Sequence, residues 1–149
     1  MPPIPVRWDD ETTKIAVYME LPTVFTTDEF LAAQDRTMDF ANSQPHRVHL
    51  IIHTAPTLQL PRGSLTLLTT AEKRAQDKMQ DAGGAVVLVS QNAIAHGIIN
   101  LARKATGIDR WQIVSTLEEA RVVIAQLHAE YLKTRPQFPF TDDSKLNKG

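Results

Sequence analysis

Three histidines that stand close together in the chain are the residues best suited to hold a metal ion. They are His46, His49 and His53. On one β-strand His49 and His53 would share a face, but they would lie about 13 Å apart, because a strand rises about 3.3 Å per residue. Both ligands of one zinc ion must lie about 2 Å from it, so this spacing does not suit a shared metal. We therefore expect structural histidines and no metal site.

A second kind of chemistry could arise where the predicted strands end. His53 closes a central strand, and Ser90 and Asn92 follow the next one. Open α/β sheets bind ligands at the carboxyl ends of their strands, so these three residues form a candidate ligand rim. His53 is also the candidate for a general base. The alternative is that such polar residues only cap the turns into helices, which accounts fully for Asn92.

Most other chemistries lack a motif in this sequence. The chain has no cysteine, which excludes thiol catalysis, thiolate metal sites and disulfides. The glycine pair at 83–84 precedes a strand instead of linking a strand to a helix, so it is not a phosphate-binding fingerprint. The nucleophile elbow of serine hydrolases is also missing. We therefore expect a protein that is not an enzyme and has no cofactor.

The composition favours a protein partner over nucleic acid or a membrane. The 149 residues include 16 Lys and Arg against 17 Asp and Glu, a net charge of −1. On the second predicted helix Glu72 dilutes the neighbouring basic residues, which predicts a solvated surface and no basic patch. The longest apolar runs, at 50–52 and 85–89, are far shorter than the roughly 18 residues of a membrane span. The N-terminus lacks the pattern of a secretory signal, and we expect a cytoplasmic location.

The elements that would position these residues alternate along the chain. Strands are predicted at 6–8 and 15–21, joined by a turn that suits an antiparallel hairpin, and then at 47–54, 85–90 and 111–114. Four helices are predicted, beginning near Thr26, Ser64, Asn92 and Thr116. Thr69 and Glu72 also have the spacing of a capping box, so the second helix could begin in two pieces.

The predicted order is β-β-α-β-α-β-α-β-α, an α/β fold with one mixed, mostly parallel sheet and flanking helices. Residues 1–132 would form this single domain. Residues 133–149 collect proline and charge, and we expect them to form a flexible tail.

Three stretches of the chain resemble the STAS domain superfamily, the SpoIIAA-like modules related to anti-sigma-factor antagonists. They are residues 21–30 (LPTVFTTDEF), 45–53 (PHRVHLIIH) and 111–121 (WQIVSTLEEAR). With the order of the elements, the resemblance covers residues 6–131. It implies a non-enzymatic regulatory or protein-interaction module of the bacterial cytoplasm, which binds a protein partner and can form a homodimer.

The resemblance also implies candidate phosphoacceptors, because such modules often switch partners when a serine or threonine near the start of the second helix is phosphorylated. Ser64 is the nearest positional match here, and Thr54 and Thr57 are weaker candidates. His53 stands where the family usually has an aspartate, and no D-S-[ST]-G segment follows it. The alternative function is a small-molecule or lipid carrier that binds at the rim of His53, Ser90 and Asn92.

Overall fold

The computed structural model describes residues 3–57, 59, 63–106 and 110–134. Its elements follow the predicted order: β1(Val6–Trp8), β2(Ala16–Leu21), α1(Thr27–Asn42), β3(His49–Thr54), α2(Ser64–Lys78), β4(Val86–Val89), α3(Ala93–Thr106), β5(Trp111–Val114) and α4(Leu117–Thr134). The prediction of an α/β fold with this order is confirmed. Helix α4 continues two residues into the predicted tail, and residues 135–149 lie outside the described residues.

The sheet follows the order of the sequence, β1-β2-β3-β4-β5. The first two strands pair antiparallel, with Val6 opposite Met19, as the hairpin prediction requires. The three remaining pairs are parallel, so the sheet is mixed and mostly parallel, as predicted. No helix within the described ranges is long and apolar enough to cross a bilayer.

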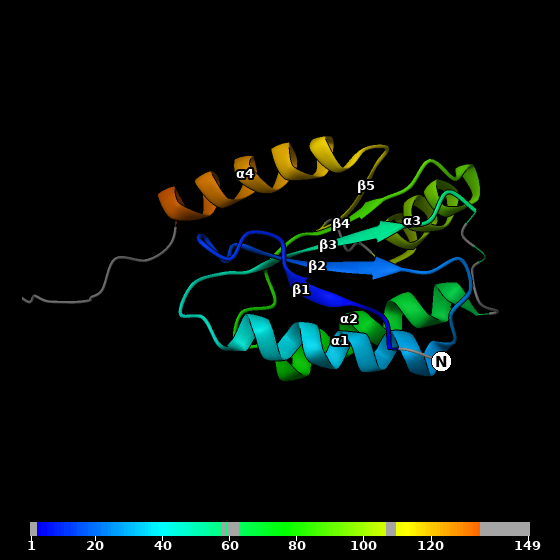
Figure 1. The fold of residues 1–149 in the computed structure, drawn as a ribbon, viewed down its shortest axis with the longest axis horizontal. Coiled ribbons are helices and arrows are strands. Elements are labelled where there is room, and N and C mark those ends of the chain that lie inside the picture. The colour runs from blue at the N-terminus through cyan, green and yellow to red at the C-terminus, as the bar shows by residue number, and fades with distance from the viewer. Residues whose placement is uncertain (1–2, 58, 60–62, 107–109, 135–149) are drawn as a thin grey trace, which may run out of the picture.

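The helices are divided unequally between the two faces of the sheet (Figure 1). On one face α1, α2 and α3 enclose the larger core, which contains Phe30, Leu67 and Ile99. On the other face α4 alone packs over β3, β4 and β5, burying Ala120 and Ile124. Ala16 and Tyr18 of β2 belong to this second core as well.

Local capping signals explain where three of the four helices begin. Thr26 and Glu29 bond reciprocally at the start of α1, a complete capping box. Glu119 and Thr116 do the same for α4, and Asn92 accepts the N–H groups of Ile94 and Ala95 in α3.

The start of α2 differs from the other three. Its N-cap is Gly63, with φ +79° and no capping side chain. The hydroxyl of Thr69 donates to the carbonyl of Thr66 inside the helix, so α2 is one helix and the two-piece alternative is wrong.

Two glycines give a matched test of this packing. A Cβ on Gly84 would lie 2.1 Å from the carbonyl oxygen of Val48, whereas one on Gly97 in α3 would meet no atom within 4 Å. We expect Gly84→Ala to lower the free energy of unfolding by about 2 kcal/mol or more, because backbone must move. Gly97→Ala should raise it by about 1 kcal/mol, since alanine is the better helix former. Urea denaturation of both variants tests this, and equal effects would contradict the packing described.

Candidate functional site

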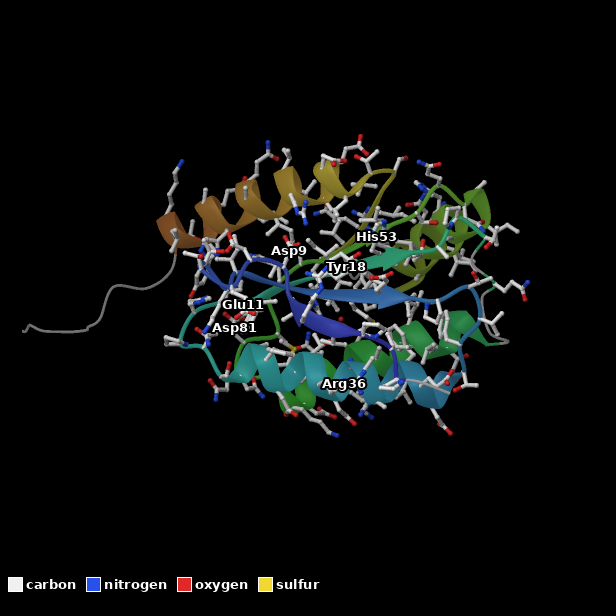
Figure 2. The ribbon with its side chains drawn as sticks, in the orientation of Figure 1. Asp9, Glu11, Tyr18, Arg36, His53 and Asp81 are labelled. Carbon is white, nitrogen blue, oxygen red and sulfur yellow. The ribbon has the colours of Figure 1, made fainter. Side chains whose placement is uncertain are left out.

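Tyr18 and His53 form a hydrogen-bonded pair on the face of the sheet that carries α4. They come from the neighbouring parallel strands β2 and β3. The Tyr18 hydroxyl lies 2.7 Å from His53 Nδ1, and the rings meet edge to face (Figure 2). Burial raises the pKa of Tyr18, so the phenol stays protonated and can donate to an unprotonated Nδ1. With Nδ1 accepting this hydrogen bond, a neutral His53 ring carries its proton on Nε2, so neither ring nitrogen is free to act as a general base while the bond is made.

Charged side chains surround this pair. The guanidinium of Arg7 lies over the ring of Tyr18, 4.4 Å from its centroid. Arg121 of α4 donates two hydrogen bonds to Asp9, which joins the helix to the turn after β1. The cluster therefore ties α4 to the β-hairpin as well as flanking His53.

Two of the three residues of the predicted rim form local hydrogen bonds, and the third bonds to the neighbouring strand. The hydroxyl of Ser90 accepts the N–H of Asn92, and Asn92 caps α3. His96 of α3 is half-buried and places Nε2 2.7 Å from the carbonyl oxygen of Ser90. His53 bonds instead to Tyr18. In the described part of the chain no hydrogen bond joins His53 to Ser90 or Asn92, and Asn92 caps α3 as the capping alternative expects.

The candidate phosphoacceptors differ in accessibility. Thr54 is buried and donates to the carbonyl of Val89, so a kinase could reach it only if the strand opened. Thr57 is exposed, and its hydroxyl lies 3.2 Å from that of Thr23. Ser64 is the first residue of α2, with its side chain outside the described residues. Ser64 is thus placed beside Gly63 at a helix N-terminus without a capping side chain.

A histidine cluster that the sequence analysis missed lies at the other end of β3. The ring of His128, from α4, lies 5.9 Å from that of His49 and 6.1 Å from that of His46. Tyr131, one turn further along α4, packs on His128. No group of three His, Cys, Asp or Glu side chains within the described ranges has a metal-binding arrangement. The only signal in the sequence was that His128 and Tyr131 share the inner side of the last helix.

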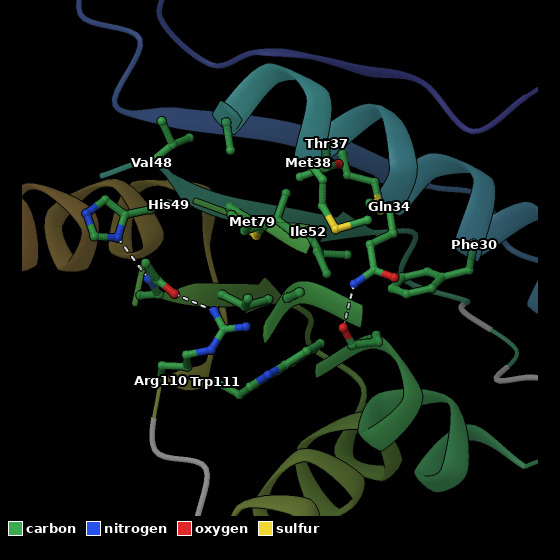
Figure 3. A pocket seen from close by; sticks show the side chains of 18 residues that line it. Phe30, Gln34, Thr37, Met38, Val48, His49, Ile52, Met79, Arg110 and Trp111 are labelled. Atoms are coloured by element: carbon green, nitrogen blue, oxygen red, sulfur yellow. Dashed lines mark hydrogen bonds between the residues drawn. The ribbon is translucent and has the colours of Figure 1, made fainter. Parts of the chain in front are cut away.

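His49 is held as a neutral base. It is buried, and its Nδ1 accepts the backbone N–H of Ala85 at 2.9 Å, so the ring proton lies on Nε2 (Figure 3). Nε2 is buried and has no hydrogen-bond partner among the described residues. Burial first, and the neighbouring His128 next, lower the pKa of His49 to about 4.

Glu72 is a second buried ionisable group that sequence reasoning placed wrongly. It is buried between α2 and β5, where it accepts hydrogen bonds from Arg110 and from the indole N–H of Trp111. Burial alone would raise the pKa of Glu72, but the hydrogen bonds from Arg110, Gln76 and Trp111 outweigh it and lower the pKa. The prediction that Glu72 belongs to a solvated surface is wrong because its partners come from 38 and 39 residues away.

A small cavity lies between α1, α2 and the sheet (Figure 3). Its volume of about 40 Å³ is far below that of typical ligand pockets, about 300–1,000 Å³. Its walls are mainly apolar, and its polar Gln34 is already bonded to the carbonyl of Ala71. The cavity is a packing space of the core, and its lining does not include His53, Ser90 or Asn92.

Comparisons of this chain with protein-family models, with curated proteins and with solved structures found no match.

The titration of His49 predicts a specific loss of stability in acid. Its pKa is about 6.5 unfolded and about 4 folded, so the unfolded chain binds more protons between these values. The contribution of neutral His49 to the free energy of unfolding is therefore fully present above pH 6.5. It decreases as the pH falls, by about 3 kcal/mol in total at pH 4 and below. About 2 kcal/mol of this should be lost between pH 7 and pH 5.

The measurement is urea denaturation at both pH values, with His49→Asn as the matched variant. Asparagine can accept the hydrogen bond from the Ala85 N–H but does not titrate. Between pH 7 and pH 5 the free energy of unfolding of the variant should therefore fall by about 2 kcal/mol less than that of the wild type. Identical pH dependence in both proteins would show that His49 is not held neutral.

Proposed function

We propose that this chain is a non-enzymatic, STAS-like regulatory module that binds a protein partner through the outer side of α3. The observation that carries the proposal is an exposed apolar stripe on this helix. Ile94 is 69% exposed and Leu101 55% exposed, and the half-buried Ile98 lies between them. The spacing of four and three residues places the three side chains on one side of the helix.

This stripe is separate from the side of α3 that packs in the core. Ala95, Ile99 and Ala102 are buried, and the first two belong to the core between the helices and the sheet. The stripe is therefore not needed to hold the helix in place. Single exposed apolar residues are ordinary on a protein surface, but a row of large ones on one helix is typical of an interaction surface.

Two features make the partner a protein with an apolar surface and an acidic rim. Lys104 lies one turn after Leu101 at the end of the stripe; it is exposed, has no ion pair within the described residues and would favour an acidic group. The helix-in-groove mode of recognition uses the same three- and four-residue spacing of apolar anchors.

The candidate phosphoacceptors lie at the edge of the sheet where this stripe begins. α2 starts at Ser64 and α3 at Ala93, each after the carboxyl end of a parallel strand, and the two helices pack together. A phosphate on Ser64 would add about two negative charges at this edge. Such a charge next to the start of an apolar surface would change which partner binds there, in the bacterial cytoplasm that the STAS resemblance implies.

The double substitution Ile94→Asp with Leu101→Asp tests the surface. Tagged wild-type and variant proteins are used for affinity capture, and the partners are identified by mass spectrometry and then titrated directly. We expect the partner's Kd to rise at least about a hundredfold, since two exposed anchors are lost. Val24→Asp, at an exposed apolar residue in the loop after β2, is the control for an introduced charge outside α3 and should bind normally. A partner that binds wild type and the α3 variant equally would overturn the proposal.

Phosphorylation is tested separately with Ser64→Asp and Thr57→Asp, each compared with its alanine variant. If Ser64 is the switch, Ser64→Asp changes the affinity for the captured partner by about tenfold or more while Ser64→Ala does not. Indifference of the affinity to all four substitutions would remove the switch and leave the binding surface standing.

A further inference from the structure

We propose that two copies of this chain associate through the outer face of α4, with the two helices antiparallel. The contact uses α4 and not α3, so it adds a second surface to the proposed function and does not depend on it. Val122, Ala125, Ala129 and Leu132 form its seam, and the two-fold axis passes between the two alanines.

The seam is an apolar face of a helix that packs on the sheet with its other side. Its four residues are all exposed, with Val122 at 56% and Leu132 at 46%. Their spacing of three, four and three residues is the repeat of a coiled-coil seam. On the inner side Ala120 and Ile124 are buried against the sheet, so α4 is already fixed in place and its outer face is presented as a rigid surface.

The shape of the seam fits a second copy of itself. Around an axis near position 127, Ala125 of one copy faces Ala129 of the other, and Val122 faces Leu132. Small residues at the centre allow two helices to approach closely, and the larger ones then pack at both ends. Gln126 lies beside the axis, exposed, where the two amides can bond to each other.

The charges on α4 favour the antiparallel arrangement over the parallel one. The first turn carries Glu118 and Glu119, and the last turn carries Lys133. Antiparallel packing brings the acidic end of each helix to the basic end of the other and opposes the two helix dipoles. Parallel packing would place Glu118 beside Glu118 of the second copy, which is repulsive.

The length of the seam sets the strength of the dimer. Val122 and Leu132 are ten residues apart, about 15 Å along the helix. A contact of this length is smaller than the interfaces of stable complexes, which bury about 800 Å² on each partner. We therefore expect a reversible dimer with a Kd in the micromolar range.

Sedimentation equilibrium of the full chain, from about 1 µM to about 1 mM, measures this association directly. Wild type should shift from monomer to dimer within the range. Val122→Lys and Leu132→Lys should each raise the dimer Kd at least about tenfold. Val24→Lys, 53% exposed but in the loop after β2, should leave the Kd unchanged. A monomer at every concentration, or a dimer that Val122→Lys and Leu132→Lys leave intact, would overturn the proposal.

A charge exchange tests the direction of the helices. Glu118→Lys and Lys133→Glu should each weaken the dimer several-fold, and the double variant should recover the wild-type Kd within about twofold. Thermal unfolding of each monomer serves as the control, because both single changes also oppose the helix dipole. A double variant that is weaker than either single variant would exclude the antiparallel pairing.

Cross-linking gives an independent readout, because the chain has no cysteine of its own. Gln126→Cys places two thiols close to the axis, whereas Glu118→Cys places them about 27 Å apart, at 1.5 Å per residue. A short bifunctional maleimide should therefore join Gln126→Cys copies and leave Glu118→Cys copies as monomers. The opposite result would show a parallel dimer, and no covalent dimer from either variant would show that the α4 faces do not meet.

Discussion

The sequential order of the parallel strands is the constraint on which the other features of this fold depend. β2, β3, β4 and β5 lie side by side in chain order, so every crossover steps in the same direction. Crossovers of one hand that step one way place their helices on one face of the sheet. α1, α2 and α3 therefore share a face, and only α4, which follows the last strand, can cover the other (Figure 1).

The single helix on the second face explains why two histidines of one strand differ so much. His49 and His53 point to the same side of β3, but α4 covers only one of them with its inner aromatic residues. His49 lies against His128, is buried and stays neutral. His53 lies beyond that contact, half-buried, and bonds to Tyr18 of β2. Both residues are histidines on the same side of β3, so the contact with α4 accounts for the difference in their burial.

Local signals in the sequence predict the helices and strands and their order. The environments of individual side chains depend on contacts between distant residues, and the sequence alone does not predict them. The capping box of Thr26 and the cap at Asn92 involve residues three positions apart, so spacing alone reveals them. Glu72 and His128 act through partners tens of residues away, Arg110 for the first and His49 for the second. Helical spacing shows which residues share a side of α2 or α4, but not which residue of another element meets them.

The near balance of charge acquires a structural meaning from these contacts. Four arginines each form a salt bridge with a carboxylate far away in the chain. Two of these salt bridges link α1 to α2 and α2 to the start of β5. The other two link the start of β3 to the turn before β4, and the β1–β2 turn to α4. Charges used in this way join the layers of the fold. The large apolar side chains exposed on α3 and α4 then offer the most distinctive surfaces. Both proposed interactions therefore use these helices and not the histidines.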